Sequence, residues 1–417
     1  MNKLIVKTDL QNKKWLKYLL EEFKRINLAK FDIEVIDIKT VIQEANVIYY
    51  ANRVYKNSIF NSQEIKPNGN IKYLNENLFI LENSISNLNF DIKYDLFWNA
   101  FVFLSRLEEQ NIKTFSYSTK HIRKDKKSFY IPIVNVLFNE LENFIKNKFN
   151  LKFEDKKQPF IDLSHDVDYI YKTWQLRFKQ SVLNLYNLKW KKFIKFLFSN
   201  PSYWCFDYWQ DLEKKYNKKS TFYVYVKYGK KTLKENLIDP SYDMISNKKL
   251  QENLKELLKN GFEIGLHGSY KSALNFEQLK KEKEILEEIL GVEITKTRQH
   301  WLNYDENITP FSHNKLFRYD STLAWNNQVG FRSGIASLYR PYNFKEEKAF
   351  DYFEIPQIIM DSNIFDYGEK DEIAFNIIQK AISIPKQPYF SISWHQRVCS
   401  NDYNWHIFYK EILNEYL

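Results

Sequence analysis

Apolar, strand-like runs alternate with amphipathic, helix-like segments through the last two thirds of the chain, and this alternation limits the possible folds most. Strand-like runs at 160–164, 220–226 and 261–267 are followed or separated by helix-like segments such as 247–260 and 276–290. Successive strand–helix units make parallel strands, because the helix returns the chain to the end where the previous strand began. The pattern predicts a mostly parallel α/β sheet or barrel with any active site at the carboxyl ends of its strands.

The first third of the chain carries a separate β-α-β pattern. A short apolar strand at 4–7 and an amphipathic helix at 14–25 precede an alternating strand at 31–38. A polar stretch and a proline interrupt the chain just before the next apolar strand. We therefore expect a smaller N-terminal α/β accessory domain at 1–155 and a larger α/β domain at 156–417.

The charge balance is basic, with 62 Lys and Arg against 52 Asp and Glu, a net charge of +10. Such a charge attracts polyanions over long range. The basic residues are spread along the chain and no nucleic-acid recognition motif accompanies them, so we expect no nucleic-acid partner. A basic amphipathic helix at 174–199 has two interpretations, a packed surface helix, which is favoured, or a peripheral membrane contact.

Cysteine usage and the N-terminal residues favour a cytoplasmic location. Cys205 and Cys399 belong to no CxxC pair and to no His/Cys cluster, so neither a thiolate metal site nor a disulfide framework is expected. Only three consecutive apolar residues precede Lys7, too few for the apolar core of a secretory signal. No apolar run approaches the roughly 20 residues that span a bilayer.

Two aspartates follow the apolar strand that opens the larger domain. In Ser164-His-Asp-Val-Asp168, Asp166 and Asp168 are two residues apart and therefore point to the same face of an extended chain. Their charges repel unless a cation or a proton separates them. The motif by itself is compatible with metal chemistry, with a helix cap or with a surface loop.

Histidines gather at the predicted strand ends of the larger domain. Of the seven histidines in the chain, four lie at or just beyond such ends: His165, His267, His300 and His395. A carboxylate with two imidazoles is the ligand set of a hydrolytic divalent-metal site, where the metal lowers the pKa of bound water. The sequence therefore predicts a divalent-metal site at the carboxyl edge of the sheet.

The order and spacing of these motifs, from about Phe160 to Trp405, resembles the polysaccharide deacetylase (NodB-type) family. The segment Leu104-Ser-Arg-Leu-Glu-Glu109 resembles the N-terminal domain that accompanies a bacterial subgroup of that family. The resemblance implies that the larger domain is a distorted (β/α) barrel. It also implies a hydrolase that removes N-acetyl groups from amino sugars with a bound divalent metal, commonly zinc.

The resemblance assigns roles to residues that match the family's motifs. It implies a catalytic base, an arginine that orients the base, an acid that protonates the leaving amine, and two metal ligands. These are, in that order, Asp166, Arg298, His395, and Asp168 with His267.

One position departs from the family's pattern. Lys271 stands where the family has a second metal-binding histidine, four residues after the first. An ammonium group has no lone pair to donate to a metal. His300 is the preferred replacement as a ligand, and His165 or a carboxylate is a less favoured one.

The substrate expected from the resemblance is an N-acetylated sugar or a glycan precursor used in surface polysaccharide biosynthesis. Aromatic residues beside the motifs could contact sugar rings: Trp301, Trp325, Trp394 and Tyr270. Two alternatives stay open at this level. The chain could hydrolyse a non-sugar amide, or it could be a catalytically inactive glycan-binding or scaffold protein, which Lys271 favours.

Overall fold

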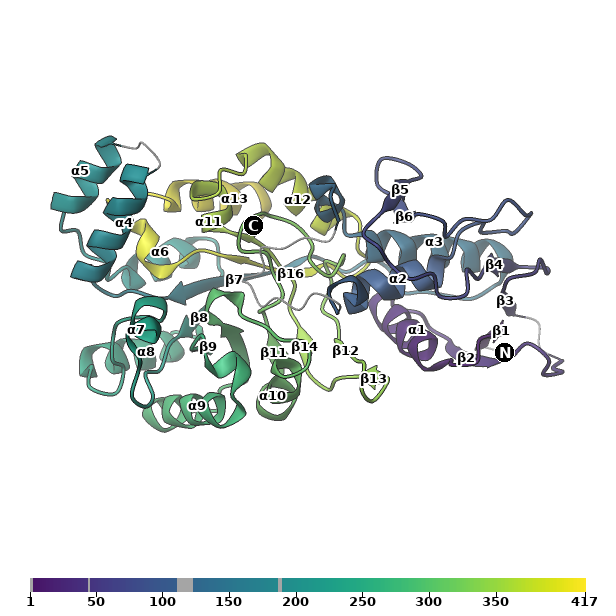
Figure 1. The fold of residues 1–417 in the computed structure, drawn as a ribbon, viewed down its shortest axis with the longest axis horizontal. Helices are drawn as coiled ribbons and strands as arrows, with labels where there is room; N and C mark the ends of the chain where they lie inside the picture. The colour runs from purple at the N-terminus through teal and green to yellow at the C-terminus, as the bar shows by residue number, and fades with distance from the viewer. Residues whose placement is uncertain (1–2, 44–45, 111–122, 187–189) are drawn as a thin grey trace.

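The computed structural model describes residues 3–43, 46–110, 123–186 and 190–417, which form an N-terminal region followed by a larger α/β region (Figure 1). The helices and strands of the N-terminal region are β1 (Lys3–Thr8), α1 (Lys14–Ile26), β2 (Asp32–Asp37), β3 (Val47–Ala51), β4 (Ser58–Phe60), β5 (Ile71–Tyr73), β6 (Phe79–Leu81), α2 (Leu96–Ser105) and α3 (Ile133–Lys148). The expected β-α-β start is therefore present.

A four-stranded parallel sheet in the order β2-β1-β3-β4 organises the N-terminal region. Helix α2 lies in the core, because all ten of its residues are buried. Asp95 caps this helix by accepting a hydrogen bond from the Trp98 backbone N–H at 3.0 Å. Packing in the core thus accounts for the aromatic residues of α2.

The larger region consists of alternating strands and helices. Its elements are β7 (Phe160–Val167), α4 (Trp174–Tyr186), α5 (Trp190–Phe198), α6 (Phe206–Lys215), β8 (Thr221–Val224), α7 (Leu233–Ile238), α8 (Lys248–Lys259), β9 (Glu263–Gly268), α9 (Phe276–Leu290), β10 (Lys296–Gln299), α10 (Thr309–Leu316), β11 (Tyr319–Asp320), β12 (Tyr342–Asn343), β13 (Lys348–Ala349), β14 (Phe353–Glu354), β15 (Gln357–Met360), α11 (Asp361–Phe365), α12 (Asp371–Ser383), β16 (Tyr389–Ser393) and α13 (His406–Tyr416). The expected single helix at 174–199 is two helices, α4 and α5.

Eight of these strands form one sheet in the order β14-β11-β10-β9-β8-β7-β16-β15. Every neighbouring pair in it is parallel. The two edge strands, β14 and β15, are consecutive in the chain and separated only by Ile355 and Pro356. Because so short a connection cannot cross a flat sheet, the sheet must curl until its edges approach one another. The predicted distorted (β/α) barrel is confirmed.

A buried arginine joins the strands inside this curled sheet. Arg298 on β10 is 0% exposed, and its guanidinium donates hydrogen bonds to side chains from several strands. The acceptors are Ser164 Oγ at 3.0 Å, Asp166 Oδ1 at 2.6 Å, Ser321 Oγ at 3.0 Å and Ser393 Oγ at 2.9 Å. The even-numbered residues of β7 therefore face the interior.

The odd-numbered residues of β7 face the surrounding helices, as the two-residue period of a strand requires. His165 is 0% exposed and lies 2.8 Å from Glu213 of α6 through Nε2. Its Nδ1 lies 2.8 Å from the Trp394 carbonyl oxygen, which can only accept a hydrogen bond. His165 is thus directed away from the barrel interior, and the less favoured assignment of this residue as a metal ligand is wrong.

The N-terminal region packs against one segment of the larger region. Ile335 and Tyr339 belong to the same hydrophobic cluster as α1, α2 and α3. The Val134 backbone N–H donates to the Gly334 carbonyl at 2.8 Å, and Arg106 forms an ion pair with Glu306. These contacts tie the two regions together, and the division at residue 155 stays a prediction.

The cysteine expectation is corrected by the structure, in which Cys205 and Cys399 form a disulfide across a sequence separation of 194 residues. Sequence spacing could not reveal the pair, because only the folded chain brings the start of α6 to the segment after β16. Disulfides are typical of oxidising compartments, so the cytoplasmic location stays a prediction. Within the described ranges, no helix is both long and apolar enough to cross a membrane.

Reduction of this disulfide should lower the free energy of unfolding by about 2–4 kcal/mol, the usual contribution of a bond that closes a long loop. Denaturant unfolding with and without dithiothreitol measures the difference. The double variant Cys205→Ala/Cys399→Ala should lose this sensitivity to reductant. Two thiols that react with Ellman's reagent in the native, unreduced protein would contradict the disulfide.

Candidate metal centre

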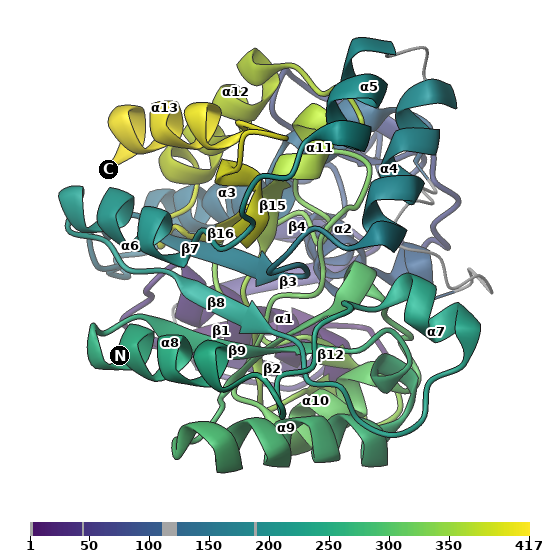
Figure 2. The same cartoon turned by 90° about the vertical axis from the view of Figure 1, so that its left-hand side faces the viewer.

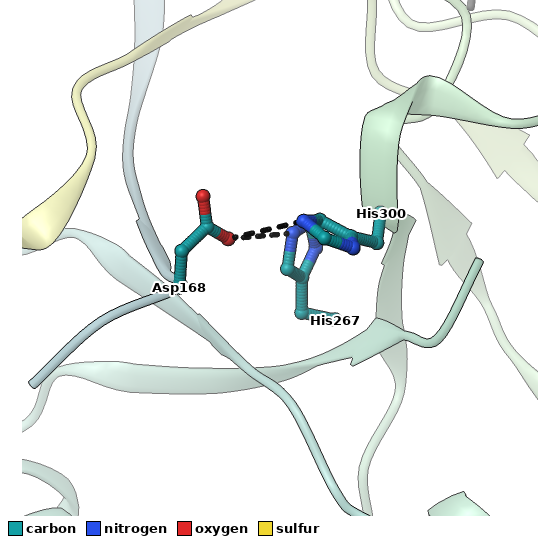
Figure 3. A group of neighbouring side chains, drawn as sticks. All are labelled: Asp168, His267 and His300. Carbon is teal, nitrogen blue, oxygen red and sulfur yellow. Dashed lines mark ion pairs between the residues drawn. The ribbon is translucent and has the colours of Figure 1, made fainter. Parts of the chain in front are cut away.

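Three buried side chains converge at the carboxyl ends of strands of the curled sheet (Figure 3). Asp168 follows β7, His267 lies in β9, and His300 immediately follows β10. The potential ligand atoms of the three all lie within 4.8 Å of one another. Asp168 Oδ1 is 3.4 Å from His267 Nε2 and 3.6 Å from His300 Nε2. The structure thus brings together the three residues expected to bind metal.

The imidazoles are oriented by partners on their far sides. His267 Nδ1 lies 2.9 Å from the Arg298 carbonyl oxygen. Since a carbonyl cannot donate, Nδ1 carries a proton. Burial lowers the pKa of His267, but Asp166 and Asp168 outweigh burial and raise it, so a bound cation would take the lone pair of Nε2 by displacing a proton from that nitrogen. His300 Nδ1 lies 3.3 Å from Asp239 Oδ1, which favours the same tautomer. Burial lowers the pKa of His300, which also favours the neutral form that binds metals.

A divalent cation fits these three side chains. Asp168 Oδ1 is buried and accepts no hydrogen bond from the described residues. A buried carboxylate oxygen facing two imidazole nitrogens is favourable only when a proton or a cation lies between them, and a cation can satisfy all three groups at once. Burial by itself would raise the pKa of Asp168, but the N–H groups that His267 and His395 direct at it when protonated hold the pKa well below its usual range. The carboxylate is therefore ionised, as a ligand must be, and one oxygen with two nitrogens is a donor set that zinc accepts.

Asp166 lies beside this group as an ionised carboxylate. Its Oδ1 accepts the 2.6 Å hydrogen bond from Arg298. Burial raises the pKa of Asp166, but the Arg298 charge outweighs burial and lowers the pKa below its ordinary value. Among the residues that the structure describes, none donates a hydrogen bond to its other oxygen, Oδ2. Asp166 can therefore accept a proton from a molecule bound at the site.

His395 lies on the other side of Asp168, with 3.3 Å between His395 Nε2 and Asp168 Oδ2. Asp361 holds the ring from behind, with 2.7 Å between His395 Nδ1 and Asp361 Oδ1. Asp361 Oδ2 also accepts the His395 backbone N–H at 2.8 Å. Burial lowers the pKa of His395, but the carboxylates of Asp361 and Asp168 outweigh it and raise the pKa to about 10. The imidazolium is the form that can donate a proton.

Sequence reasoning missed three residues that support this site. Asp239 and Asp361 orient His300 and His395, and Arg397 Nη1 donates to Asp168 Oδ2 at 3.1 Å. Asp361 directly follows the apolar strand β15, as Asp168 directly follows β7. The same position at the end of a strand could have identified Asp361 from the sequence. Asp239 lies in a loop after α7, and nothing in its local sequence indicates a partner.

Lys271 lies outside the group. Its side chain is 58% exposed, and its Nζ is 3.5 Å from Glu235 Oε1. His300 reaches the site through an unusual backbone, because Trp301 and Leu302 both have positive φ angles, 60° and 50°. Such conformations cost on the order of 1 kcal/mol per non-glycine residue and persist where the surrounding structure imposes them. The ammonium group of Lys271 therefore does not lie among the candidate metal ligands.

The four aromatic residues expected to contact substrate separate into two groups. Trp301 is 37% exposed with its ring 5.9 Å from that of His300, and Tyr270 is partly buried. Trp394 is 0% exposed within the main core, and Trp325 is 3% exposed against Phe129. Their ring faces are covered by packing, so the assignment of Trp325 and Trp394 to substrate binding is wrong.

Comparison with solved structures finds similarity to polysaccharide deacetylases and to a related pseudoenzyme. A candidate polysaccharide deacetylase from Mycobacterium smegmatis is 15% identical over 63% of this chain and 85% of that chain, with a TM-score of 0.38. A candidate polysaccharide deacetylase involved in O-antigen biosynthesis, from Bordetella bronchiseptica, is 15% identical over 57% and 72%, with a TM-score of 0.30. A CE4-family pseudoenzyme from Bacillus anthracis is 9% identical over 62% of each chain, with a TM-score of 0.29.

These structures are of the kind that the sequence motifs resemble. No protein-family model and no curated protein matches the chain. With identities and TM-scores this low, function is inferred from the side chains of this chain and not from its neighbours.

Removal of His300 should weaken binding of a divalent cation by roughly 100-fold or more, because one of three protein ligands is lost. Chelator competition with zinc and elemental analysis of the purified protein measure the effect in His300→Ala. Lys271→Ala is the matched control and should bind the cation as the wild type does. Equal metal binding by the wild type and His300→Ala would exclude His300 as a ligand.

Loss of the carboxylate behind His300 should have a smaller effect. In Asp239→Ala the ring keeps its donor nitrogen but loses the partner that fixes its tautomer, so we expect metal affinity to fall by roughly 10–100-fold. The same chelator competition measures this change. An affinity as low as that of His300→Ala would mean that Asp239 does more than orient the ring.

Proposed function

We propose that this chain is a metal-dependent hydrolase that removes the N-acetyl group of an amino sugar. The observation that carries the proposal is the ionised, unpartnered oxygen of Asp168 between two imidazole nitrogens, with a carboxylate and an imidazolium on either side. Asp168, His267 and His300 would hold the cation. Zinc is the metal that this donor set favours, and polysaccharide precursors made for the cell surface are the substrate class that we propose.

A bound divalent cation would polarise the acyl oxygen of the substrate and lower the pKa of a water molecule. The protein supplies the rest of the chemistry. Asp166 would accept a proton from the attacking water at its unpaired oxygen, while Arg298 fixes the carboxylate through the other one. Water oxygen adds to the acyl carbon, and the transferred proton resides on Asp166.

Breakdown of the resulting adduct needs an acid at the amine. His395 would donate its Nε2 proton to the departing nitrogen as the C–N bond breaks, so that acetate and a free amino sugar leave. The raised pKa of His395, about 10, supports this role because the ring stays protonated in neutral solution. Asp361 keeps the second ring nitrogen occupied, so that the proton faces the site.

The partly exposed Trp301 and Tyr270 are the proposed contacts for the sugar ring. The alternative of an inactive glycan-binding protein was favoured by Lys271. That side chain is 58% exposed, and His300 joins Asp168 and His267 in its place, which supports the catalytic proposal. Hydrolysis of a non-sugar amide on the same site is distinguished by substrate: acetate release from a panel of N-acetylated sugars supports the proposal, and release only from non-sugar amides contradicts it.

Asp166→Asn and His395→Ala should each lower kcat by about 10²–10⁴-fold, the usual contribution of a general base or acid. Acetate release from N-acetylated sugars measures the rates with zinc-loaded protein. Both variants should still bind zinc, which chelator competition checks, because neither residue is a proposed ligand. Asp168→Ala should lose both activity and metal. Unchanged kcat in Asp166→Asn would overturn its role as the base.

A further inference from the structure

Helices α4 and α5 form a hairpin with large apolar side chains on its outer face. These side chains are exposed to solvent. On each helix the exposed apolar residues recur every four positions, which forms one stripe per helix. We call these residues, which are between 46% and 78% exposed, the hairpin stripe: Trp174, Phe178 and Val182 on α4, and Trp190, Ile194 and Phe198 on α5. The neighbouring helix α7 repeats the pattern with Leu233 and Leu237, which are 86% and 61% exposed.

The hairpin also has an inner face, which packs against the rest of the chain. The apolar residues of the stripe are therefore additional to those that hold the hairpin in place. Leu176 of α4 and Phe196 of α5 are buried in a small cluster with Tyr203. Lys172 fixes the hairpin from inside, because its Nζ donates to the Phe196 carbonyl at 2.6 Å and to Asp402 at 2.7 Å. The outward stripe is therefore presented in a defined orientation.

The charge of this segment points to one kind of partner. Between Asp168 and Asp207 the sequence contains seven Lys or Arg residues and no Asp or Glu, and six of the seven remain when Lys172, whose charge is paired with Asp402, is set aside. Exposed Trp and Phe beside lysines are the composition of helices that lie on anionic membranes, where rings enter the headgroup boundary and cations meet lipid phosphates. A symmetric contact with a second copy would oppose this basic segment to itself with no carboxylate to pair with it.

The stripe lies on the same side of the large sheet as the candidate metal centre. Figure 2 shows α4, α5 and α7 on the side toward which the arrows of β7 and β8 point, which is the carboxyl edge that carries the site. Helix α4 begins at Trp174, shortly after Asp168, and α7 ends at Ile238, directly before the Asp239 that orients His300. A surface that rests on these helices would therefore lie close to the site.

We propose that the hairpin stripe and the exposed leucines of α7 dock on the surface of an anionic phospholipid bilayer. A consequence, which rests on the proposed function, is that the N-acetylated sugar would be attached to a lipid carrier in that bilayer. The membrane contact itself needs no catalysis.

The test is sedimentation of the full-length protein with vesicles of phosphatidylcholine, with and without phosphatidylglycerol. We expect binding to the anionic vesicles that weakens with salt, and about tenfold or more weaker binding in Trp174→Ser/Phe178→Ser/Phe198→Ser. The matched control carries three exposed apolar residues from elsewhere, Val41→Ser/Leu88→Ser/Ile407→Ser, and should bind as the wild type does.

A second measurement guards against misfolding of the triple variant. Brominated phosphatidylglycerol should quench the tryptophan fluorescence of the wild type, and less so in Trp174→Phe/Trp190→Phe, which keeps the apolar surface. Absent vesicle binding, equal binding by the stripe and control variants, or a wild-type dimer that the stripe substitutions dissociate would each overturn the proposal. Acetate release from unattached N-acetylated sugars is measured in parallel, so that failure of membrane binding is distinguished from failure of the proposed function.

Discussion

The Arg298 guanidinium inside the curled sheet is the constraint on which the site depends. A buried arginine stays charged and must have each of its donors satisfied, or its burial would cost several kcal/mol. Hydroxyl and carboxylate groups from β7 and β16 and from the end of β11 provide that satisfaction. The same contacts fix the spacing of strands whose carboxyl ends carry the candidate metal centre, and they keep Asp166 ionised although it is buried.

Around this arginine the site is built from pairs in which a carboxylate or carbonyl oxygen orients an imidazole. The Arg298 carbonyl holds His267, Asp239 holds His300, and Asp361 holds His395. Each partner fixes the proton of the nitrogen that it contacts and so directs Nε2 of all three rings toward Asp168. The group behind the ring does not by itself separate ligand from acid, because His300 and His395 both have a carboxylate there. Burial lowers the pKa of His300, whereas for His395 the carboxylates of Asp361 and Asp168 outweigh burial and raise the pKa.

Two contacts connect the candidate metal centre to the proposed membrane surface. The disulfide joins the start of α6 to the segment that follows His395, and Lys172 joins the α4–α5 hairpin to Asp402 in the same segment. The proposed membrane surface and the proposed acid are thus connected through a few residues of one loop. Such a connection would hold the site at a constant distance from a docked bilayer, which suits a substrate whose sugar extends from a lipid.

Local sequence determined much of the architecture, because strand and helix periods and the residues at strand ends are local properties. The helix at 276–290 matches α9, and Asp166, Asp168, His267, Arg298, His300 and His395 meet at one edge as expected from parallel strands. The tertiary structure alone decided what depends on distant parts of the chain. It paired Cys205 with Cys399, covered Trp325 and Trp394 by packing, turned Lys271 outward, and brought Asp239 and Asp361 behind their histidines. Periodicity tells which face of an element a residue occupies, but the neighbour on that face is set by how the whole sheet closes.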